Sequence, residues 1–367
     1  MRTIMLVDLD YFFAQCEELR NPAIKDKPVV VCVYSGRSED SGAVSTANYV
    51  ARKYGVKSGM SIYLAKKKLE STEAIFLPVD YAYYEEISQQ VMEVLRTHAD
   101  RFEQVGIDEA FLDVTQRTSG EFQKAKDVAT AIKNELWIRQ KLTCSIGIGP
   151  NKLVAKIASD NKKPDGLTIV EPDHVESFLS PLPVARLIGV GAKTQEKMHS
   201  LVINTIFDLA NYDMQKLITV FGRTSATYFR NASLGKDDEP VEEKGEAESI
   251  SRISTLKQDS HDLSFILEKT DQLCSEIHVV ITEQRLRFKT VATIVITTDM
   301  SIHTRSKTFE NLTSDLETMK KTVRELLEKF LEENELGARR VGVKISNLVR
   351  EQKNQKELTS FIQPHKA

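Results

Sequence analysis

The feature that most constrains this chain is a pair of apolar runs that each end abruptly in acidic residues. The run IMLV is followed by Asp8, and the stretch QVGIDEAFLDV places Asp108 and Glu109 in a second strand-like segment. Neighbouring side chains on a strand point to opposite faces, so these two acids converge only where the backbone turns, and Gly106 permits such a turn. If the first strand neighbours the second, three carboxylates meet.

A cluster of this kind predicts a metal site. Charged side chains are costly to bury unless they are paired or bind a metal. Carboxylates with no His or Cys nearby suit Mg²⁺, which prefers hard oxygen ligands. The alternative is that the acids are solvated strand ends or salt-bridge partners. Two acidic clusters that terminate apolar strands favour the metal site at Asp8, Asp108 and Glu109.

The net charge of the 367-residue chain is −3, which by itself argues against nucleic-acid binding. The charge is unevenly distributed, because segment 236–248 (KDDEPVEEKGEAE) holds seven acids and two lysines. Having almost no apolar residue, it is typical of a solvated linker. Without its net −5, the rest of the chain carries +2.

Composition limits the classes of protein further. A content of 41% hydrophobic and 28% charged residues is typical of globular proteins. No apolar run approaches the roughly 20 residues that span a bilayer, and the early acids argue against a signal peptide. The four cysteines form no CxxC pair, which argues against zinc and disulfides and favours a reducing cytoplasm: Cys16, Cys32, Cys144 and Cys274.

Periodicity predicts alternating strands and helices before the acidic segment. The predicted strands are 3–9, 28–34, 102–106, 110–115 and 142–148, and the predicted helices are 11–20, about 45–54, 80–99, 121–140 and one from Asn151. From residue 173 the pattern is helical with short loops. After the acidic segment the predicted order is strand, helix, strand, strand, helix, strand, with long helices over about 262–285 and 313–334.

Four blocks of the sequence resemble the signature blocks of the Y-family DNA polymerases. In chain order they are LVDLDYFFAQCEE, SGAVSTANYVARKYGVKSGM, GIDEAFLDV and GIGPNKLVAKIASDNKKPDG. The resemblance runs from about residue 1 to 350 and is nearest to the archaeal DNA polymerase IV group, which copies past damaged templates. It implies an α+β fold, a right-hand polymerase with palm, fingers, a helical thumb and a C-terminal α/β little finger domain.

The resemblance also implies the domain boundaries. They are palm 1–10 and 78–166, fingers 11–77, thumb 167–232 with a helix–hairpin–helix, acidic linker 233–247, DNA-binding little finger 248–350, and a flexible tail 351–367. The acidic linker departs from the basic linkers expected in close relatives. It is either merely solvated, which we favour, or it weakens DNA affinity and alters processivity.

Carried over to this sequence, the resemblance makes Asp8, Asp108 and Glu109 the catalytic metal ligands, with the Leu9 carbonyl as a further ligand. Two Mg²⁺ ions, or Mn²⁺, would activate the primer 3′-hydroxyl for in-line attack on the α-phosphate of a deoxynucleoside triphosphate. Asp10 lies in the same motif and is not predicted to be a ligand. A neutralised or hydrogen-bonded structural role is the open alternative for it.

The nucleotide-binding residues follow from the same comparison. Thr46, Tyr49 and Arg52 fall at three-residue spacing on a predicted helix, and the resemblance implies that Tyr49, Arg52 and Lys163 contact the β- and γ-phosphates while Thr46 assists. The alternative for Arg52 and Lys163 is a solvated surface cation. Phe13 stands where the family has a steric gate, a ring beneath the sugar that excludes a 2′-hydroxyl; the alternative for it is a core residue.

Two further regions are predicted to hold DNA. LIGVGAKTQEKM matches the helix–hairpin–helix pattern hhGhGxxT, in which Gly189 and Gly191 let backbone amides approach a phosphate, although Ile188 replaces the usual Pro. The predicted strands after the linker carry eight Lys or Arg and one acid, whereas helix 313–335 carries seven acids and four bases. This cationic sheet predicts contacts with the DNA backbone through Arg252, Lys289, Arg305, Lys307, Arg339, Arg340 and Lys344.

The C-terminal stretch QKELTSFI resembles a sliding-clamp-binding box. Its anchors would be Gln355, Leu358, Phe361 and Ile362, with Ile362 where a second aromatic residue is expected. The alternative is a disordered end with a stray Phe.

The sequence therefore predicts a low-fidelity translesion DNA polymerase that acts on primer–template DNA as a monomer in the cytoplasm, without contact with a membrane. Its length leaves no room for a proofreading exonuclease. A nucleotide cyclase with a palm-like sheet is an alternative, against which the helix–hairpin–helix and the cationic sheet argue. An inactive DNA-binding relict is another, against which the complete set of acids and phosphate-binding cations argues.

Overall fold

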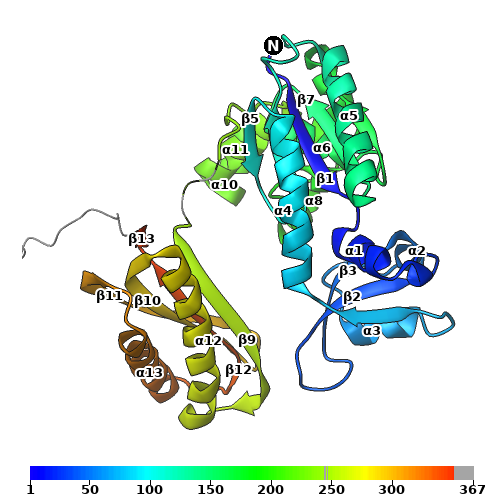
Figure 1. Ribbon diagram of the computed structural model, residues 1–367. Coiled ribbons are helices and arrows are strands. Elements are labelled where there is room, and N and C mark those ends of the chain that lie inside the picture. The colour runs from blue at the N-terminus through cyan, green and yellow to red at the C-terminus, as the bar shows by residue number, and fades with distance from the viewer. Residues whose placement is uncertain (244, 246, 351–367) are drawn as a thin grey trace, which may run out of the picture. The chain divides into compact units, whose positions relative to one another are not determined.

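The computed structural model describes residues 1–243, 245 and 247–350 (Figure 1). The chain divides into two compact units. The first comprises Met1–Cys32, Val44–Met60 and Leu64–Lys244, and the second comprises Val33–Ala43, Ser61–Tyr63 and the part that follows from Gly245. Among the described residues, helices long and apolar enough to cross a membrane are absent.

A five-stranded sheet in the order β5-β6-β1-β7-β8 forms the centre of the first unit. Its strands are β1 (Ile4–Leu9), β5 (Arg101–Gln104), β6 (Glu109–Asp113), β7 (Cys144–Gly149) and β8 (Leu167–Ile169). β1 runs antiparallel to β6 and β7, and its register places Asp8 opposite Glu109 on one side and Ser145 on the other. The two acidic clusters of the sequence thus meet at one end of the sheet.

Both faces of this sheet are covered, which explains why all six residues of β1 are buried. Met5, Val7 and Leu9 belong to a core shared with α4 (Tyr81–Thr97) and α5 (Phe122–Gln140), whereas Ile4 and Leu6 pack on the opposite face with a residue of α6 (Lys152–Ser159). Acids at the end of such a strand are held in a mostly buried setting, where partners are required. Strand β8 extends this sheet three residues beyond the predicted end of the palm at 166.

The segment between β1 and α4 forms a small three-stranded sheet in the order β3-β2-β4 with short helices. Its elements are α1 (Phe12–Arg20), η1 (Pro22–Ile24), β2 (Val29–Tyr34), β3 (Gly42–Ala47), α2 (Tyr49–Lys53), α3 (Ile62–Lys68) and β4 (Ile75–Pro78). The predicted helix over about 45–54 is wrong for its first residues, because 42–47 pair as a strand. The Asn48 side chain begins α2 instead, accepting the amide hydrogen of Ala51.

Short helices follow β8 and pack around a separate core. They are η2 (Pro172–His174), α7 (Val175–Leu179), η3 (Val184–Arg186), α8 (Ala192–Ser200), α9 (Ile206–Asn211), α10 (Met214–Phe221) and α11 (Arg223–Ser233). This core includes Leu153 and Ile157 of α6, so the helical region is joined to the central sheet through that helix. The helical, short-looped character expected from residue 173 onward is confirmed.

The acidic segment is mostly exposed where the structure describes it up to residue 243, but one of its residues is docked on the central sheet. Val241 is 1% exposed and packs with Ile4, Leu6 and Phe111 of the central sheet. The prediction of a solvated linker therefore fits most residues of this stretch but not Val241. A single apolar residue among acids was enough to fix it to the sheet.

The acids of this stretch find cations around that anchor. Glu239 lies 3.3 Å from the Lys152 ammonium, and Glu243 forms an ion pair with Arg96. The Asp237 carboxylate accepts the Leu153 amide hydrogen at the start of α6, at 3.0 Å. Charge that looked uncompensated along the sequence is neutralised by residues distant in the chain.

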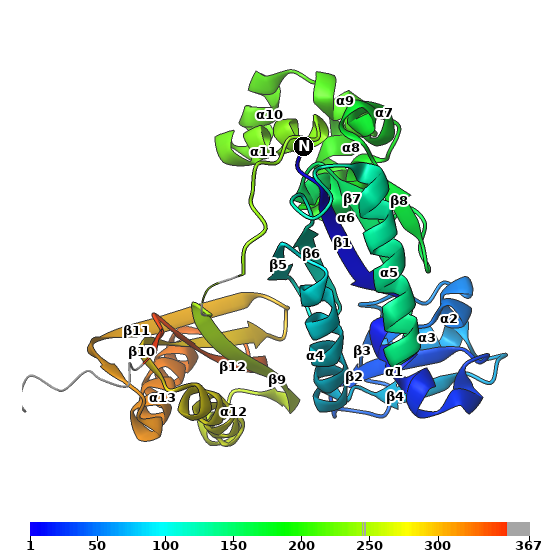
Figure 2. The same ribbon diagram turned by 45° about the horizontal axis from the view of Figure 1, so that its top comes forward.

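The second unit contains a four-stranded antiparallel sheet in the order β11-β10-β12-β9, with a short strand β13 paired to β10. Its elements are β9 (Ser249–Ser260), α12 (Leu263–Gln284), β10 (Leu286–Thr297), β11 (Ile302–Thr313), α13 (Leu316–Glu333), β12 (Ala338–Ser346) and β13 (Val349–Arg350). The predicted order of strand, helix, strand, strand, helix, strand is confirmed. Figure 2 shows α12 and α13 on one face of the sheet, where they enclose its core.

Candidate active site and nucleic-acid interface

A cavity of about 350 Å³ opens at the ends of β1 and β6. It is lined by all the residues predicted to bind metal or nucleotide, namely Asp8, Leu9, Phe13, Thr46, Tyr49, Arg52, Asp108, Glu109 and Lys163. We call it the carboxylate cavity. These residues come from four separate stretches of the sequence, so their convergence is a property of the fold. Five lining residues were not predicted to have a role: Tyr11, Phe12, Ser45, Ser58 and Lys156.

The three acids are brought together by the strand register and a turn. Asp8 and Glu109 are direct neighbours across the β1–β6 pair. Asp108 lies in the turn that begins at Gly106, whose amide donates to the Glu109 carbonyl, and the Asp108 carbonyl accepts the Leu9 amide at 2.9 Å. The turn inferred from Gly106 thus carries Asp108 toward its two partners.

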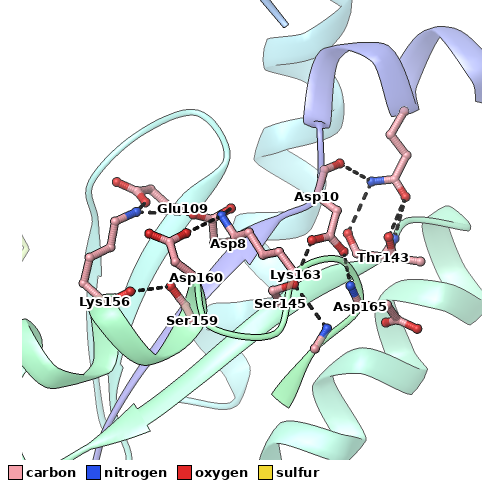
Figure 3. Close-up of polar contacts among 12 residues, drawn as sticks. Asp8, Asp10, Glu109, Thr143, Ser145, Lys156, Ser159, Asp160, Lys163 and Asp165 are labelled. Atoms are coloured by element: carbon pink, nitrogen blue, oxygen red, sulfur yellow. Dashed lines mark hydrogen bonds and ion pairs between the residues drawn. The ribbon is translucent and has the colours of Figure 1, made fainter. Parts of the chain in front are cut away.

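Two lysines lie among the acids (Figure 3). The Lys156 ammonium is 3.3 Å from Asp8 Oδ2 and forms a second ion pair with Glu109. Lys163 Nζ lies 2.7 Å from Asp8 Oδ1 and 2.9 Å from Asp160 Oδ1. Burial opposes the charged form of both lysines. Hydrogen bonds and the charges of the carboxylates outweigh it and raise the pKa of each above its ordinary value.

The electrostatics of the cavity favour a bound cation. Burial raises the pKa of Asp108 to about 6, and the negative charges of Asp8 and Glu109 add to this rise. In the part of the chain that the structure describes, no three acidic, His or Cys side chains are grouped closely enough to hold an ion as they stand. Asp8 and Glu109 are paired with lysines instead. Three hard oxygen donors, whose mutual repulsion contributes to the raised pKa of Asp108, fit a divalent metal.

One side of the cavity is lined by residues of β3 and α2, which carry the predicted nucleotide-binding residues Thr46, Tyr49 and Arg52. Thr46 lies on β3 and not on a helix, so the predicted common helical face holds only for Tyr49 and Arg52. The Arg52 guanidinium is 4.8 Å from the centre of the Tyr49 ring, and its Nε donates to the Ala47 carbonyl. The Tyr49 hydroxyl is buried and, among the described residues, has no hydrogen-bond partner. A buried polar atom that lines a cavity in this way suits a ligand oxygen.

The two phenylalanines of the first motif have different environments. Phe12 also borders the cavity, but it is 2% exposed and belongs to the core of the central sheet. Phe13 lines the carboxylate cavity, and its ring stacks on Tyr84 with centroids 4.4 Å apart and an interplanar angle of 17°. A ring braced in this way cannot yield easily to a bulkier ligand. The steric gate at Phe13 stays a prediction.

Lys156 is the charged residue of the cavity that sequence reasoning missed. It lies on α6 within the apolar run LVAKIA, and its neighbours Val154, Ala155 and Ile157 are buried. A lysine inside such a run was the available signal, because lysine is seldom buried without a partner.

The predicted helix–hairpin–helix has the backbone features expected of it. Gly189 has φ of +83°, a left-handed conformation that favours glycine, and Gly191 is the N-cap of α8. Ile188, which stands where the family usually has Pro, is 44% exposed, and its carbonyl accepts the Tyr228 hydroxyl at 2.9 Å. That hydrogen bond supports the turn from α11.

In the second unit, strand register shows which side chains share a face of the sheet. Val343 and Ile345 of β12 are in the core under the helices, and the residues that alternate with them, such as Lys344, point to the opposite face. We call this opposite face the open face. The strand pairing gives two rows of residues on the open face that contain a predicted cation. The first row, from β11 to β9, is Ser306, Ala292, Lys344 and Ser251, and the second is Ile302, Ile296, Arg340 and Thr255.

Only part of the predicted cationic surface lies on the open face. Arg305 and Lys307 share a face with core residues Val291 and Val295 and pair with α13: Arg305 with Glu333, and Lys307 with Glu325 at 2.7 Å. Both side chains therefore lie on the helix side of the sheet, and the prediction that they share one cationic sheet face with Lys344 is wrong. The acidic residues of α13 attract these cations, and alternation along β11 turns both the same way.

The three remaining predicted cations lie on an edge strand or at irregularities in the strand pairing. Arg252 lies opposite Val343 on edge strand β9 and is exposed. Lys289 and Arg339 lie at register shifts, and Arg339 Nη1 is 3.6 Å from Asp259. The predicted clamp-binding anchors Gln355, Leu358, Phe361 and Ile362 lie outside the described residues.

Three family models match the chain. Residues 7–160 match the impB/mucB/samB family, residues 172–201 its helix–hairpin–helix motif, and residues 247–358 its C-terminal domain. The chain is 48% identical to DNA polymerase IV of Nitrosopumilus maritimus over 98% of its own length and 99% of the relative's. It is 37% identical to DNA polymerase IV of Saccharolobus solfataricus, covering 94% and 96% of the two chains.

Solved structures show the same similarity. A Y-family DNA polymerase chimera of Dbh and Dpo4 superposes with a TM-score of 0.89 at 36% identity, covering 95% of this chain and 100% of the other. An insertion ternary complex of Dbh DNA polymerase gives a TM-score of 0.69 at 36% identity with the same coverage.

Proposed function

Because the chain belongs to the impB/mucB/samB family, the Y-family DNA polymerases, we infer that it is a template-dependent DNA polymerase of low fidelity that extends primers past damaged template bases. The observation that carries this inference is the carboxylate cavity. Three acids suited to a divalent metal share that cavity with Tyr49 and Arg52, which suit phosphate oxygens. Relatives solved as ternary complexes support primer–template DNA and deoxynucleoside triphosphates as its substrates.

In this proposal the acids hold the metal that the family requires. Asp8, Asp108, Glu109 and the Leu9 carbonyl would bind Mg²⁺, with Mn²⁺ as an alternative, and a pair of such ions lowers the barrier by activating the primer 3′-hydroxyl and neutralising the leaving pyrophosphate. Asp8 and Glu109 would hold these ions in place of their lysine partners. Lys156 and Lys163 then remain close to the developing negative charge.

The other residues bind and select the nucleotide. The Tyr49 hydroxyl donates its unpaired hydrogen to a β- or γ-phosphate oxygen, and Arg52 and Lys163 supply the cationic partners. Thr46 lines the same wall of the cavity. Phe13, braced by Tyr84, lies under the sugar and leaves no space for a 2′-hydroxyl. Backbone amides at Gly189 and Gly191 bind a DNA phosphate.

A primer-extension assay with Mg²⁺ tests this function directly. Wild-type protein should extend a primer on an undamaged template, and Asp108→Ala should reduce the rate at least about 100-fold while DNA affinity stays within twofold. A cyclase would convert a nucleoside triphosphate without primer or template. Template-independent turnover, or extension that survives Asp108→Ala, contradicts the proposal.

The C-terminal anchors suggest a second partner. We propose that Gln355, Leu358, Phe361 and Ile362 bind a sliding clamp, on the strength of the stretch QKELTSFI alone. Deleting residues 355–367 should abolish capture of the protein by an immobilised clamp and leave clamp-free extension unchanged. Capture that persists after the deletion rejects the box.

A further inference from the structure

Asp10 is an acid of the first motif to which metal binding gives no role. It is 1% exposed, and its carboxylate points away from Asp8 and Glu109 toward β7 and the turn that follows Lys163 (Figure 3). Asp10 Oδ1 accepts the Ser145 hydroxyl at 2.8 Å, and Oδ2 accepts the Asp165 amide at 2.8 Å. Both oxygens are therefore engaged with protein donors.

Through these contacts, Asp10 and Ser145 hold the turn formed by residues 163–166. Ser145 Oγ also accepts the Gly166 amide at 3.2 Å, so two consecutive amides of the turn are held by Asp10 and its partner. Asp165 has φ of +54°, an uncommon conformation for a residue other than glycine. Gly166 has no space for a Cβ, which would lie 2.1 Å from the Lys162 carbonyl oxygen. A turn of this shape needs its amides satisfied to persist.

Asp10 is itself held by backbone hydrogen bonds, so its carboxylate can fix the position of the turn. Its amide donates to the Thr143 carbonyl at 3.1 Å, and its carbonyl accepts Gln15 Nε2 at 2.8 Å. Gln15 Oε1 in turn accepts the Thr143 amide at 2.7 Å. The end of β1, the start of β7 and the turn are thereby tied together by buried hydrogen bonds, which are costly to leave unmade.

The residue that this turn carries is Lys163, whose ammonium lies among the acids of the carboxylate cavity. We propose that Asp10 is a positioning residue for nucleotide binding: by fixing the turn 163–166 it sets where Lys163 meets the triphosphate. This inference rests on the proposed function, which gives Lys163 its phosphate contact. Asp10 acts as a hydrogen-bond acceptor here, so the chemistry requires acceptor oxygens and not a metal-binding charge.

The test separates positioning from metal binding. The equilibrium Kd of a non-hydrolysable deoxynucleotide is measured on the protein bound to dideoxy-terminated primer–template, alongside the extension rate at saturating nucleotide. Asp10→Ala should raise the Kd at least about tenfold and change the saturated rate less than threefold. Asp10→Asn keeps an acceptor for the Asp165 amide and should restore both quantities to within threefold of wild type.

A double-mutant cycle with Lys163 completes the test. In a Lys163→Ala background, Asp10→Ala should cause no further rise in Kd, because its effect passes through that lysine. Thr143→Val, which removes a hydroxyl bond to Gln15 beside Asp10 but leaves the turn untouched, is the matched control and should not change the Kd. Should Asp10→Ala fail to fold, Ser145→Ala replaces it, with an expected threefold rise that also disappears when Lys163 is absent.

Three outcomes overturn the inference: an unchanged Kd in Asp10→Ala or its substitute, independent multiplicative effects in the cycle, or an Asp10→Asn variant as inactive as a metal-ligand variant. Wild-type protein that does not extend primers at all rejects the proposed function instead. The two failures are thus distinguishable.

Discussion

At one end of the central sheet, Lys156 pairs with both Asp8 and Glu109, and Lys163 pairs with Asp8. On the open face of the C-terminal sheet, in contrast, Arg340 and Lys344 stand in rows of uncharged side chains. The first arrangement is mostly buried, so every charge there depends on its neighbours. The second is spread over a surface, where each cation acts nearly alone. The difference suits one region to chemistry at a fixed point and the other to binding a uniform polyanion.

The strongest way to break this comparison is to remove one buried charge. Asp8→Asn should lower the extension rate about 10³-fold, because it removes a metal ligand and leaves Lys156 and Lys163 with one acidic partner fewer. Rapid-quench primer extension measures the rate. Asp113→Asn, an acid at the opposite end of β6, is the control and should stay within twofold of wild type; equal losses in the two variants would contradict a localised charge centre.

The second-largest effect is expected from Phe13, the proposed steric gate in the same cavity. Phe13→Ala should raise the incorporation of ribonucleotides at least tenfold relative to deoxyribonucleotides, since the ring that limits the space beneath the sugar is gone. Single-nucleotide extension with rATP and dATP measures the ratio. Phe12→Leu changes a core residue outside the proposed sugar contact and should leave the ratio unaltered. Unchanged selectivity in Phe13→Ala rejects the gate.

A third prediction concerns the acidic segment that ends the first region. Burying Val241 contributes about 2 kcal/mol, so Val241→Asp should release the segment and speed its cleavage by a protease roughly tenfold or more. Mass spectrometry of the fragments locates the cut. Val279→Asp, at a side chain that is 55% exposed, should not change the cleavage rate. Resistance in the Val241 variant would show that the buried valine does not hold the segment.

The smallest effect is expected on the open face. Lys344→Ala should weaken DNA binding two- to fivefold and lower the slope of log affinity against log salt by about one. Lys307→Ala, whose side chain faces α13 and pairs with Glu325, should change neither. Fluorescence anisotropy at several salt concentrations checks both variants. A larger effect in Lys307→Ala than in Lys344→Ala would mean that DNA binds the helix side of the sheet and not the open face.

Much of this arrangement could be predicted from local patterns. Asp8, Asp108 and Glu109 could be recognised as one cluster because each lies at the end of an apolar strand, and a buried charge needs a partner in any fold. The order of elements in the C-terminal region followed from periodicity, which reports the local environment of each residue. Both patterns could be interpreted without the structure because they depend on residues that are close together in the chain.

What could not be predicted depends on distant partners. Residues 45–47 have helix-like neighbours in sequence, but β-sheet pairing determines their conformation. The count of cations in the C-terminal strands was correct, yet Arg305 and Lys307 turn toward α13, which only register and the position of that helix decide. Val241 carried too little local hydrophobicity to indicate docking; its partners on β1 are more than 200 residues away.

The surroundings of Lys344 have one further consequence for the DNA contact proposed for it. Its row partners Ser251, Ala292 and Ser306 are all short, so its half-buried four-carbon stem has room to change rotamer. In the proposed contact, a phosphate displaced by a bulky lesion, or advanced by one nucleotide, would stay within reach of the same ammonium. Such a contact would adapt to a duplex of variable shape.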